Sequence, residues 1–143
     1  MYDWLLFVHV LGATGFIGIA VAFWGVVLAT RPNAPVLSPR AALLVSTPLG
    51  RGIAIASMIA LVFGVWLAIY VDGYELWDGW IAASLVLWLV AGGLGERTGR
   101  AMSASYEGGE WAALDRRRGV LLHAVTSAAL LAILFLMITK PGA

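Results

Sequence analysis

The sequence has no cysteine, and only 12% of its 143 residues are charged. Without cysteine the chain cannot form disulfides, thiolate metal sites, iron–sulfur clusters or cysteine nucleophiles. A soluble domain normally carries about 25% charged residues, whereas 62% of this chain is hydrophobic and its mean hydropathy is +0.92. A water-soluble protein of this size could not bury so much apolar surface, so the composition indicates an integral membrane protein.

Four apolar segments are long enough to cross a bilayer, which takes about 20 residues per helix. They cover residues 4–28, 52–71, 77–95 and 119–139. The connections between them are short to moderate, which favours antiparallel packing of neighbours. We therefore expect a single membrane domain over residues 1–143, built as an all-α, four-helix transmembrane bundle in up-down-up-down order.

The basic residues are distributed unevenly, because eight of the nine belong to one side of this bundle and the ninth is Lys140. The eight are Arg31, Arg40, Arg51, Arg97, Arg100, Arg116, Arg117 and Arg118. Basic loops stay on the cytoplasmic side of a membrane. We therefore expect both termini and the acidic loop over residues 72–78 to lie outside the cytoplasm.

Two loop features bear on where the helices end. Residues 31–50 contain four prolines, which oppose a regular helix, so this segment is expected to be irregular. The Gly108–Gly109 pair suggests a turn, with the third and fourth spans continuing as helices on either side. Tyr106 and Trp111 are expected at the inner membrane interface, where aromatic residues are enriched.

Small residues recur at every fourth position in several spans. Lipid supplies no hydrophobic drive to bring helices together, so close packing of small side chains takes its place. These residues are therefore expected at helix–helix contacts. They are Gly52, Ala56, Ala60, Gly64 and Ala68 in the second span, Gly18 and Ala22 in the first, and Ala124, Ala128 and Ala132 in the fourth.

His9 is the first of two histidines within the spans, about 7 Å below the outer boundary at the usual helical rise. A polar ring at that depth is expensive without a partner, and ionisable groups inside membranes are functional candidates. One interpretation is a haem or metal ligand, or a proton-transfer group. The other is a neutral imidazole bonded to a neighbouring helix or to interfacial water.

His123 lies four residues into the fourth span, which begins at the opposite face. It is therefore about 15 to 20 Å from His9 along the membrane normal. The two histidines cannot both ligate one iron or one metal ion from these positions. We interpret His123 as an interfacial histidine hydrogen-bonded to water or to lipid phosphate.

The remaining charged residues gather at the two faces. The acidic loop could collect cations, but without a second histidine it is a poor transition-metal site, and a solvated loop is the simpler interpretation. The basic cluster fits positive-inside signalling and contact with anionic lipid of the bilayer, and nothing indicates a nucleic-acid partner. Its members are Arg97, Arg100, Arg116, Arg117 and Arg118.

Two stretches, residues 3–18 (DWLLFVHVLGATGFIG) and 79–85 (GWIAASL), resemble the first and third helices of the CopD/HemJ-like group of bacterial membrane proteins. The resemblance is closest to uncharacterised four-helix members and implies the bacterial cytoplasmic membrane. In HemJ-type protoporphyrinogen oxidases, a histidine matching His9 is implicated in haem binding together with a lysine. Ser84 stands at the position of that lysine, and serine is not an axial ligand of b-type haem.

The resemblance thus implies a protein linked to haem b or to a metal through His9, without the oxidase activity. Two other functions stay open. The chain could be a non-enzymatic membrane component that assembles with itself or with a larger complex. It could also form a transporter or channel as an oligomer, since one chain offers few polar groups in the middle of the membrane.

Overall fold

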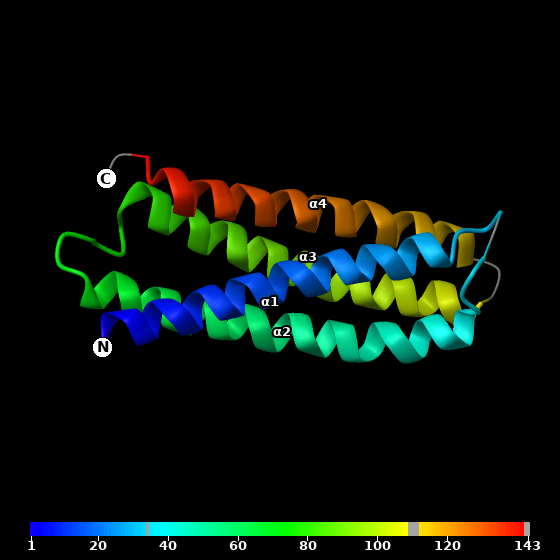
Figure 1. The fold of residues 1–143 in the computed structure, drawn as a ribbon. Coiled ribbons are helices and arrows are strands. Elements are labelled where there is room, and N and C mark those ends of the chain that lie inside the picture. Colours follow the sequence, from blue (N-terminus) through cyan, green and yellow to red (C-terminus); the bar gives the residue numbers. More distant parts are fainter. Residues whose placement is uncertain (34, 109–111, 142–143) are drawn as a thin grey trace.

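The computed structural model describes residues 1–33, 35–108 and 112–141. Most of them lie in four helices, α1 (Tyr2–Ala29), α2 (Pro39–Tyr70), α3 (Gly79–Glu107) and α4 (Ala112–Thr139). Consecutive helices run antiparallel, so the start of α1, the end of α4 and the α2–α3 connection share one end, here named the terminal end (Figure 1). The opposite end, near Arg31, Arg40 and Arg116, is named the arginine-rich end. The predicted all-α four-helix bundle is confirmed.

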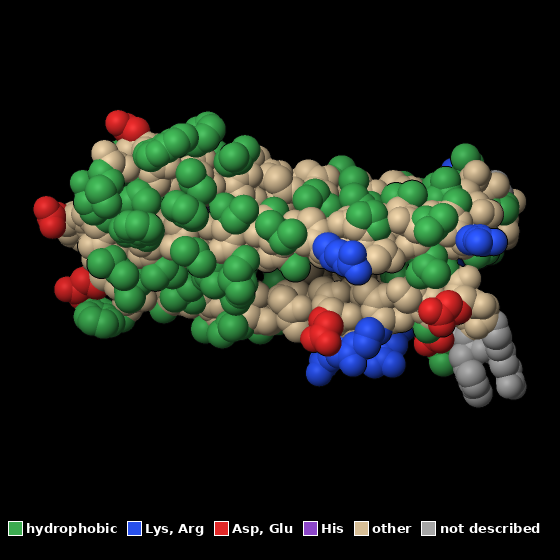
Figure 2. Space-filling view, turned by 90° about the horizontal axis from the view of Figure 1, so that it is seen from below, with side chains coloured by type: hydrophobic (Ala, Val, Ile, Leu, Met, Phe, Trp, Pro, Cys, Tyr) green, Lys and Arg blue, Asp and Glu red, His purple; other side chains and the backbone are tan. Residues whose placement is uncertain are grey.

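All four helices are long and apolar enough to cross a membrane. With 28 to 32 residues each, they measure about 42 to 48 Å, more than the roughly 30 Å of the hydrocarbon core. Figure 2 shows hydrophobic side chains covering the half toward the terminal end, with acidic side chains at its tip and charged side chains of both signs over the other half. The excess length of the helices therefore lies at the arginine-rich end.

The segment over residues 31–50, expected to be irregular, is helical from Pro39 onward. Ser38 caps this helix, because its hydroxyl accepts a hydrogen bond from the Ala41 backbone N–H at 3.3 Å. Proline suits the first helical position, where its missing N–H would be unpaired anyway. Pro48 lies inside α2 and removes one backbone hydrogen bond. The prediction is therefore wrong beyond residue 38, because proline density says little without the position of each proline.

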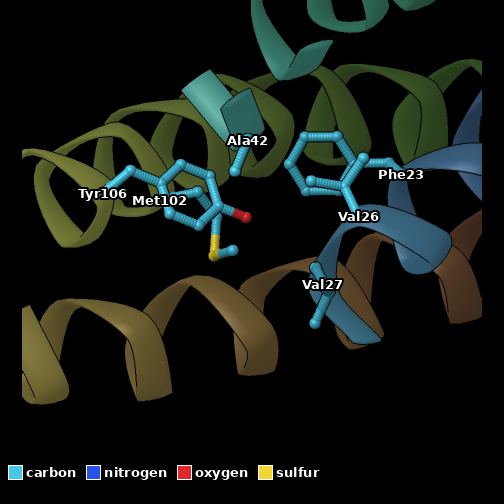
Figure 3. Packing of buried hydrophobic residues seen from close by; sticks show 6 residues of the cluster. All are labelled: Phe23, Val26, Val27, Ala42, Met102 and Tyr106. Atoms are coloured by element: carbon cyan, nitrogen blue, oxygen red, sulfur yellow. The ribbon is translucent and has the colours of Figure 1, made fainter. Parts of the chain in front are cut away.

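The α3–α4 connection begins at Gly108, whose φ of 84° is readily adopted by glycine. The helices continue toward this turn as predicted, while Gly109 and Trp111 lie outside the described residues. Tyr106 is buried within the bundle. It belongs to a cluster at the arginine-rich end, and Figure 3 shows how the members pack. They are Phe23, Val26 and Val27 of α1, Ala42 of α2, and Met102 and Tyr106 of α3.

The small-residue face of α2 packs mainly against α1. A Cβ added to Gly52 would lie 3.0 Å from the Ile19 side chain, and one added to Gly64 would lie 2.8 Å from the His9 ring. Ala68 instead joins a buried cluster with residues 80 and 81 of α3. The α2 face therefore contacts α1 from Gly52 to Gly64 and α3 near Ala68.

The contact residues predicted in α1 lie outside the contacts between helices of this chain. Gly18 and Ala22 are exposed, and a Cβ on Gly18 would meet no atom within 4 Å. Gly12 and Gly15 contact α2 instead. Gly18 and Ala22 lie about a quarter to a third of a turn around the helix from the face that meets α2. The alanines expected to pack from α4 are also outside the core, since Ala124 and Ala128 are exposed.

Candidate functional site

His9 lies between α1 and α2, where its Nδ1 is 2.7 Å from the carbonyl oxygen of Ala60. A carbonyl oxygen only accepts, so Nδ1 carries the proton and donates this hydrogen bond. The ring occupies the space beside Gly64, which has no side chain of its own. This arrangement corresponds to the second interpretation of His9, a neutral imidazole bonded to a neighbouring helix.

The backbones of α1 and α2 meet closely just beyond His9. A Cβ added to Gly12 would lie 2.7 Å from the Ala60 backbone nitrogen and 3.0 Å from the Ala56 carbonyl oxygen. The glycines of α1 near His9 therefore admit a helix, and they leave no room for a flat cofactor between α1 and α2.

Ser84, the residue at the lysine position of the resemblance, is buried in α3. Its hydroxyl donates a 2.7 Å hydrogen bond to the carbonyl of Trp80 in the same helix. Serine would supply no axial ligand to iron. Together with the closed α1–α2 contact at His9, this set of residues does not fit a haem held between these helices.

The acidic loop at the terminal end bonds mainly to itself. A carboxylate oxygen of Asp78 accepts from the Glu75 backbone N–H at 3.0 Å, and Glu75 accepts from the Trp77 indole. Asp72 is exposed. Across the described residues, no three His, Cys, Asp or Glu side chains are grouped so as to hold a metal ion.

His123 is buried between α1 and α4. Its Nε2 lies 3.3 Å from the Ala20 carbonyl oxygen, so this nitrogen carries the proton and Nδ1 is left as an acceptor. The ring packs against Phe23 and Trp24, each with its centroid at 4.8 Å. The interpretation of His123 as an interfacial histidine bonded to water or lipid is therefore wrong, since α1 covers the ring.

A hydrogen-bonded chain fixes the same part of α4 to α1. The indole nitrogen of Trp24 donates to the Ser127 hydroxyl at 3.1 Å, and this hydroxyl donates to the His123 carbonyl at 2.8 Å. Arg116, nearer the arginine-rich end, donates to the Val27 carbonyl at 2.8 Å and to the Thr30 hydroxyl at 3.0 Å. A cation suits the carbonyl-rich end of a helix, so Arg116 stabilises the packing of α4 on α1.

A cavity of about 630 Å³ lies between the α1–α2 hairpin and the α3–α4 hairpin, with His123 in its wall. All four helices contribute, and Figure 2 shows a hollow on the face seen there, near charged side chains. Among its lining residues are Arg51 and Glu96, one from each hairpin. Together with His123 they lie 11 or 12 residues from the arginine-rich end of their helices, about 16 to 18 Å along the axis.

Several of the hydroxyl groups that line this cavity are already engaged as donors. Thr98 donates to the Leu94 carbonyl at 2.9 Å, and Thr126 donates to the Leu122 carbonyl at 2.9 Å. Ser57 likewise bonds to a carbonyl of α2, at 3.1 Å. Their oxygens, like Nδ1 of His123, can still accept. The middle of the cavity thus offers acceptors, and its strong donor is the guanidinium of Arg51.

The sequence does not predict this cavity, because the depth of the two histidines and the family resemblance indicate individual residues and not the space between helices. One signal was present in α3, where Gly92, Gly95 and Gly99 follow one another at helical spacing and all line the cavity. A Cβ added to any of these three glycines would meet no atom within 4 Å. These three glycines thus leave room beside α3 where they line the cavity.

Comparisons with protein-family models, with curated proteins and with solved structures find no match to this chain. The resemblance to the CopD/HemJ-like group therefore rests only on residues 3–18 and 79–85.

Proposed function

We propose that this chain is a ligand-binding protein of the bacterial cytoplasmic membrane, and that the cavity between its hairpins takes a small amphipathic molecule. The cavity carries this proposal. Its volume of about 630 Å³ falls within the roughly 300 to 1,000 Å³ of ligand sites. The walls come from all four helices, so a bound molecule would contact both hairpins.

The lining changes in polarity along the bundle axis. Ser46, Thr47 and Ser103 line the part toward the arginine-rich end, whereas Met58 and Trp88 line the part toward the middle of the bundle. A molecule with a polar head and an apolar body matches this gradient, because each part would meet groups of its own kind.

The arginine-rich end is proposed to face the cytoplasm, on the basis of the eight basic residues on that side. The absence of native cysteine makes this testable by labelling single-cysteine variants in intact cells. Asp72→Cys should react with an impermeant maleimide from outside, and Glu107→Cys only after the cells are opened. Both positions are exposed. Outside labelling of Glu107→Cys would reverse the assigned topology.

Anionic lipid remains a proposed partner of the basic cluster, but its arginines differ in how exposed they are. Arg97, Arg100, Arg117 and Arg118 are exposed and can meet lipid headgroups at that face, although Arg100 is also paired with Glu96 at 2.9 Å. Arg116 is half-buried and bonded to α1, so its part is in helix packing.

The ligand site is tested by filling the cavity at one of two adjacent glycines. Both Gly92 and Gly93 are exposed, and a Cβ added to either would meet no atom within 4 Å, but only Gly92 lines the cavity. We expect Gly92→Leu to weaken binding of cis-parinaric acid, a fluorescent amphiphile, by about tenfold or more, while Gly93→Leu binds as wild type does. Bilayer nanodiscs of zwitterionic lipid keep detergent from competing. Equal binding by the two variants would refute the site.

Self-assembly is a second candidate function, favoured by the exposed small residues of α1. Gly18, Ala22 and Gly25 are exposed, and a Cβ on either glycine would meet no atom within 4 Å. Such a face permits close approach of another helix in lipid. Ala22→Cys should cross-link to a second copy in membranes, and Val21→Cys, exposed about 100° around the helix, should not. Cross-linking at both positions or at neither would count against this interface.

A further inference from the structure

We infer that the occupant of the cavity is an anionic phospholipid of the cytoplasmic leaflet, with its phosphate at Arg51 and an acyl chain along the apolar part. This inference rests on the proposed function, because it names the ligand of the same cavity. Three observations support it: the charge at the opening, the depth of Arg51, and the nature of the walls.

The charge of the cavity lining favours an anion. Arg51 and Glu96 are its two charged side chains within the described residues. Glu96 is paired with Arg100 at 2.9 Å, so its charge is already partly balanced by a cation. No hydrogen bond or ion pair within the described residues engages Arg51. A guanidinium with free donors binds phosphate well, since its planar fork matches two phosphate oxygens.

The depth of Arg51 matches that of a lipid phosphate. Arg51 lies 19 residues before Tyr70, the last residue of α2 at the terminal end, which is about 28 Å along the axis. The hydrocarbon core is about 30 Å thick. With Tyr70 at one interface, Arg51 reaches the other, where the phosphates of the opposite leaflet lie.

The walls beyond Arg51 suit a hydrocarbon chain. Ala54, Met58 and Trp88 present apolar surface toward the middle of the bundle, and Gly92 and Gly95 leave space beside them. The hydroxyls of this part donate to their own helices, so they leave no donor without a partner when a chain covers them. An acyl chain can therefore cover these hydroxyls without leaving their donors unpaired.

The experiment measures which lipid stays bound when the protein is released from nanodiscs holding equal amounts of phosphatidylglycerol and phosphatidylcholine. Native mass spectrometry reads the retained lipid directly. We expect wild type to retain phosphatidylglycerol over phosphatidylcholine by roughly fivefold, the effect of one favourable charge contact near the surface. Arg51→Gln should abolish the preference, and Arg51→Lys should keep most of it. Arg40→Gln, an exposed change on the same helix that does not line the cavity, should behave as wild type.

Each outcome has one meaning. A preference that survives Arg51→Gln, or equal retention of both lipids by wild type, would overturn the anionic-lipid assignment. A preference for phosphatidylcholine would do the same. Gly92→Leu separates this inference from the proposed function: if it releases lipids of both kinds, the cavity is the site whatever the headgroup. If it releases neither, the proposed function fails as well.

Discussion

His9 and His123 make the same kind of contact in two different surroundings. Each donates from one ring nitrogen to a carbonyl of a neighbouring helix, at 2.7 Å from His9 and 3.3 Å from His123. His9 is half-buried in a closed helix–helix contact, whereas His123 is buried and lines a cavity. The two histidines therefore differ in their surroundings and not in their hydrogen bonds: a helix–helix contact encloses His9, and a cavity borders His123.

The largest expected effect comes from removing the buried ring. His123→Ala loses the contacts with Phe23 and Trp24 and leaves the Ala20 carbonyl without this partner, so it should lower the free energy of unfolding by about 2 to 4 kcal/mol. His9→Ala, which loses a partly exposed ring and one hydrogen bond, should cost about 1 kcal/mol. Thermal unfolding in detergent measures both. If the two variants lose equal stability, the buried His123 contributes no more to folding than the half-buried His9.

The α1–α2 contact beside His9 is tested by adding volume to it. Gly12→Leu would force a side chain against the backbone of α2, and overpacking of this kind costs about 1 to 3 kcal/mol. Gly18→Leu is the matched control, because a Cβ there meets no atom within 4 Å. We expect only the Gly12 variant to unfold at a lower temperature in detergent. A stable Gly12→Leu protein would mean that the helices are not closed at this point.

A double-mutant cycle isolates the contact between His9 and Gly64. Gly64→Ala alone places a methyl group 2.8 Å from the ring and should destabilise the protein by about 1 kcal/mol. In the His9→Ala background the same change should be nearly neutral, giving a coupling of about 1 kcal/mol. Additive effects in unfolding measurements would show that the ring does not occupy this space.

The smallest effect is expected at Ser127, which supports the His123 region. Ser127→Ala breaks the link from the Trp24 indole to the His123 carbonyl and should cost about 0.5 to 1 kcal/mol. Thr139→Ala is the control, since that exposed hydroxyl bonds only within α4. Thermal unfolding in detergent should separate the two variants. If Thr139→Ala lowers the stability as much as Ser127→Ala does, the hydrogen bond between Trp24 and Ser127 does not stabilise the packing of α1 on α4.

Several features were predictable because they depend on short stretches of chain. The four apolar runs predicted four helices, and Gly108 was expected near the end of the third. The small-residue face of α2 was also readable, since five such residues share one side of a helix. Pro39 departs from the prediction for a local reason, because Ser38 caps the helix and proline suits the position after the cap.

By itself, the sequence determined that the chain forms apolar helices, how many there are, and which end carries the arginines, because hydropathy, length and charge are properties of each segment alone. Only the tertiary structure decided that Gly12 rather than Gly18 meets α2, that His9 bonds to Ala60, and that His123 borders a cavity. These outcomes depend on which face of each helix turns toward which neighbour. In lipid, that choice follows from close packing and interhelical hydrogen bonds between distant parts of the chain, which no single segment encodes.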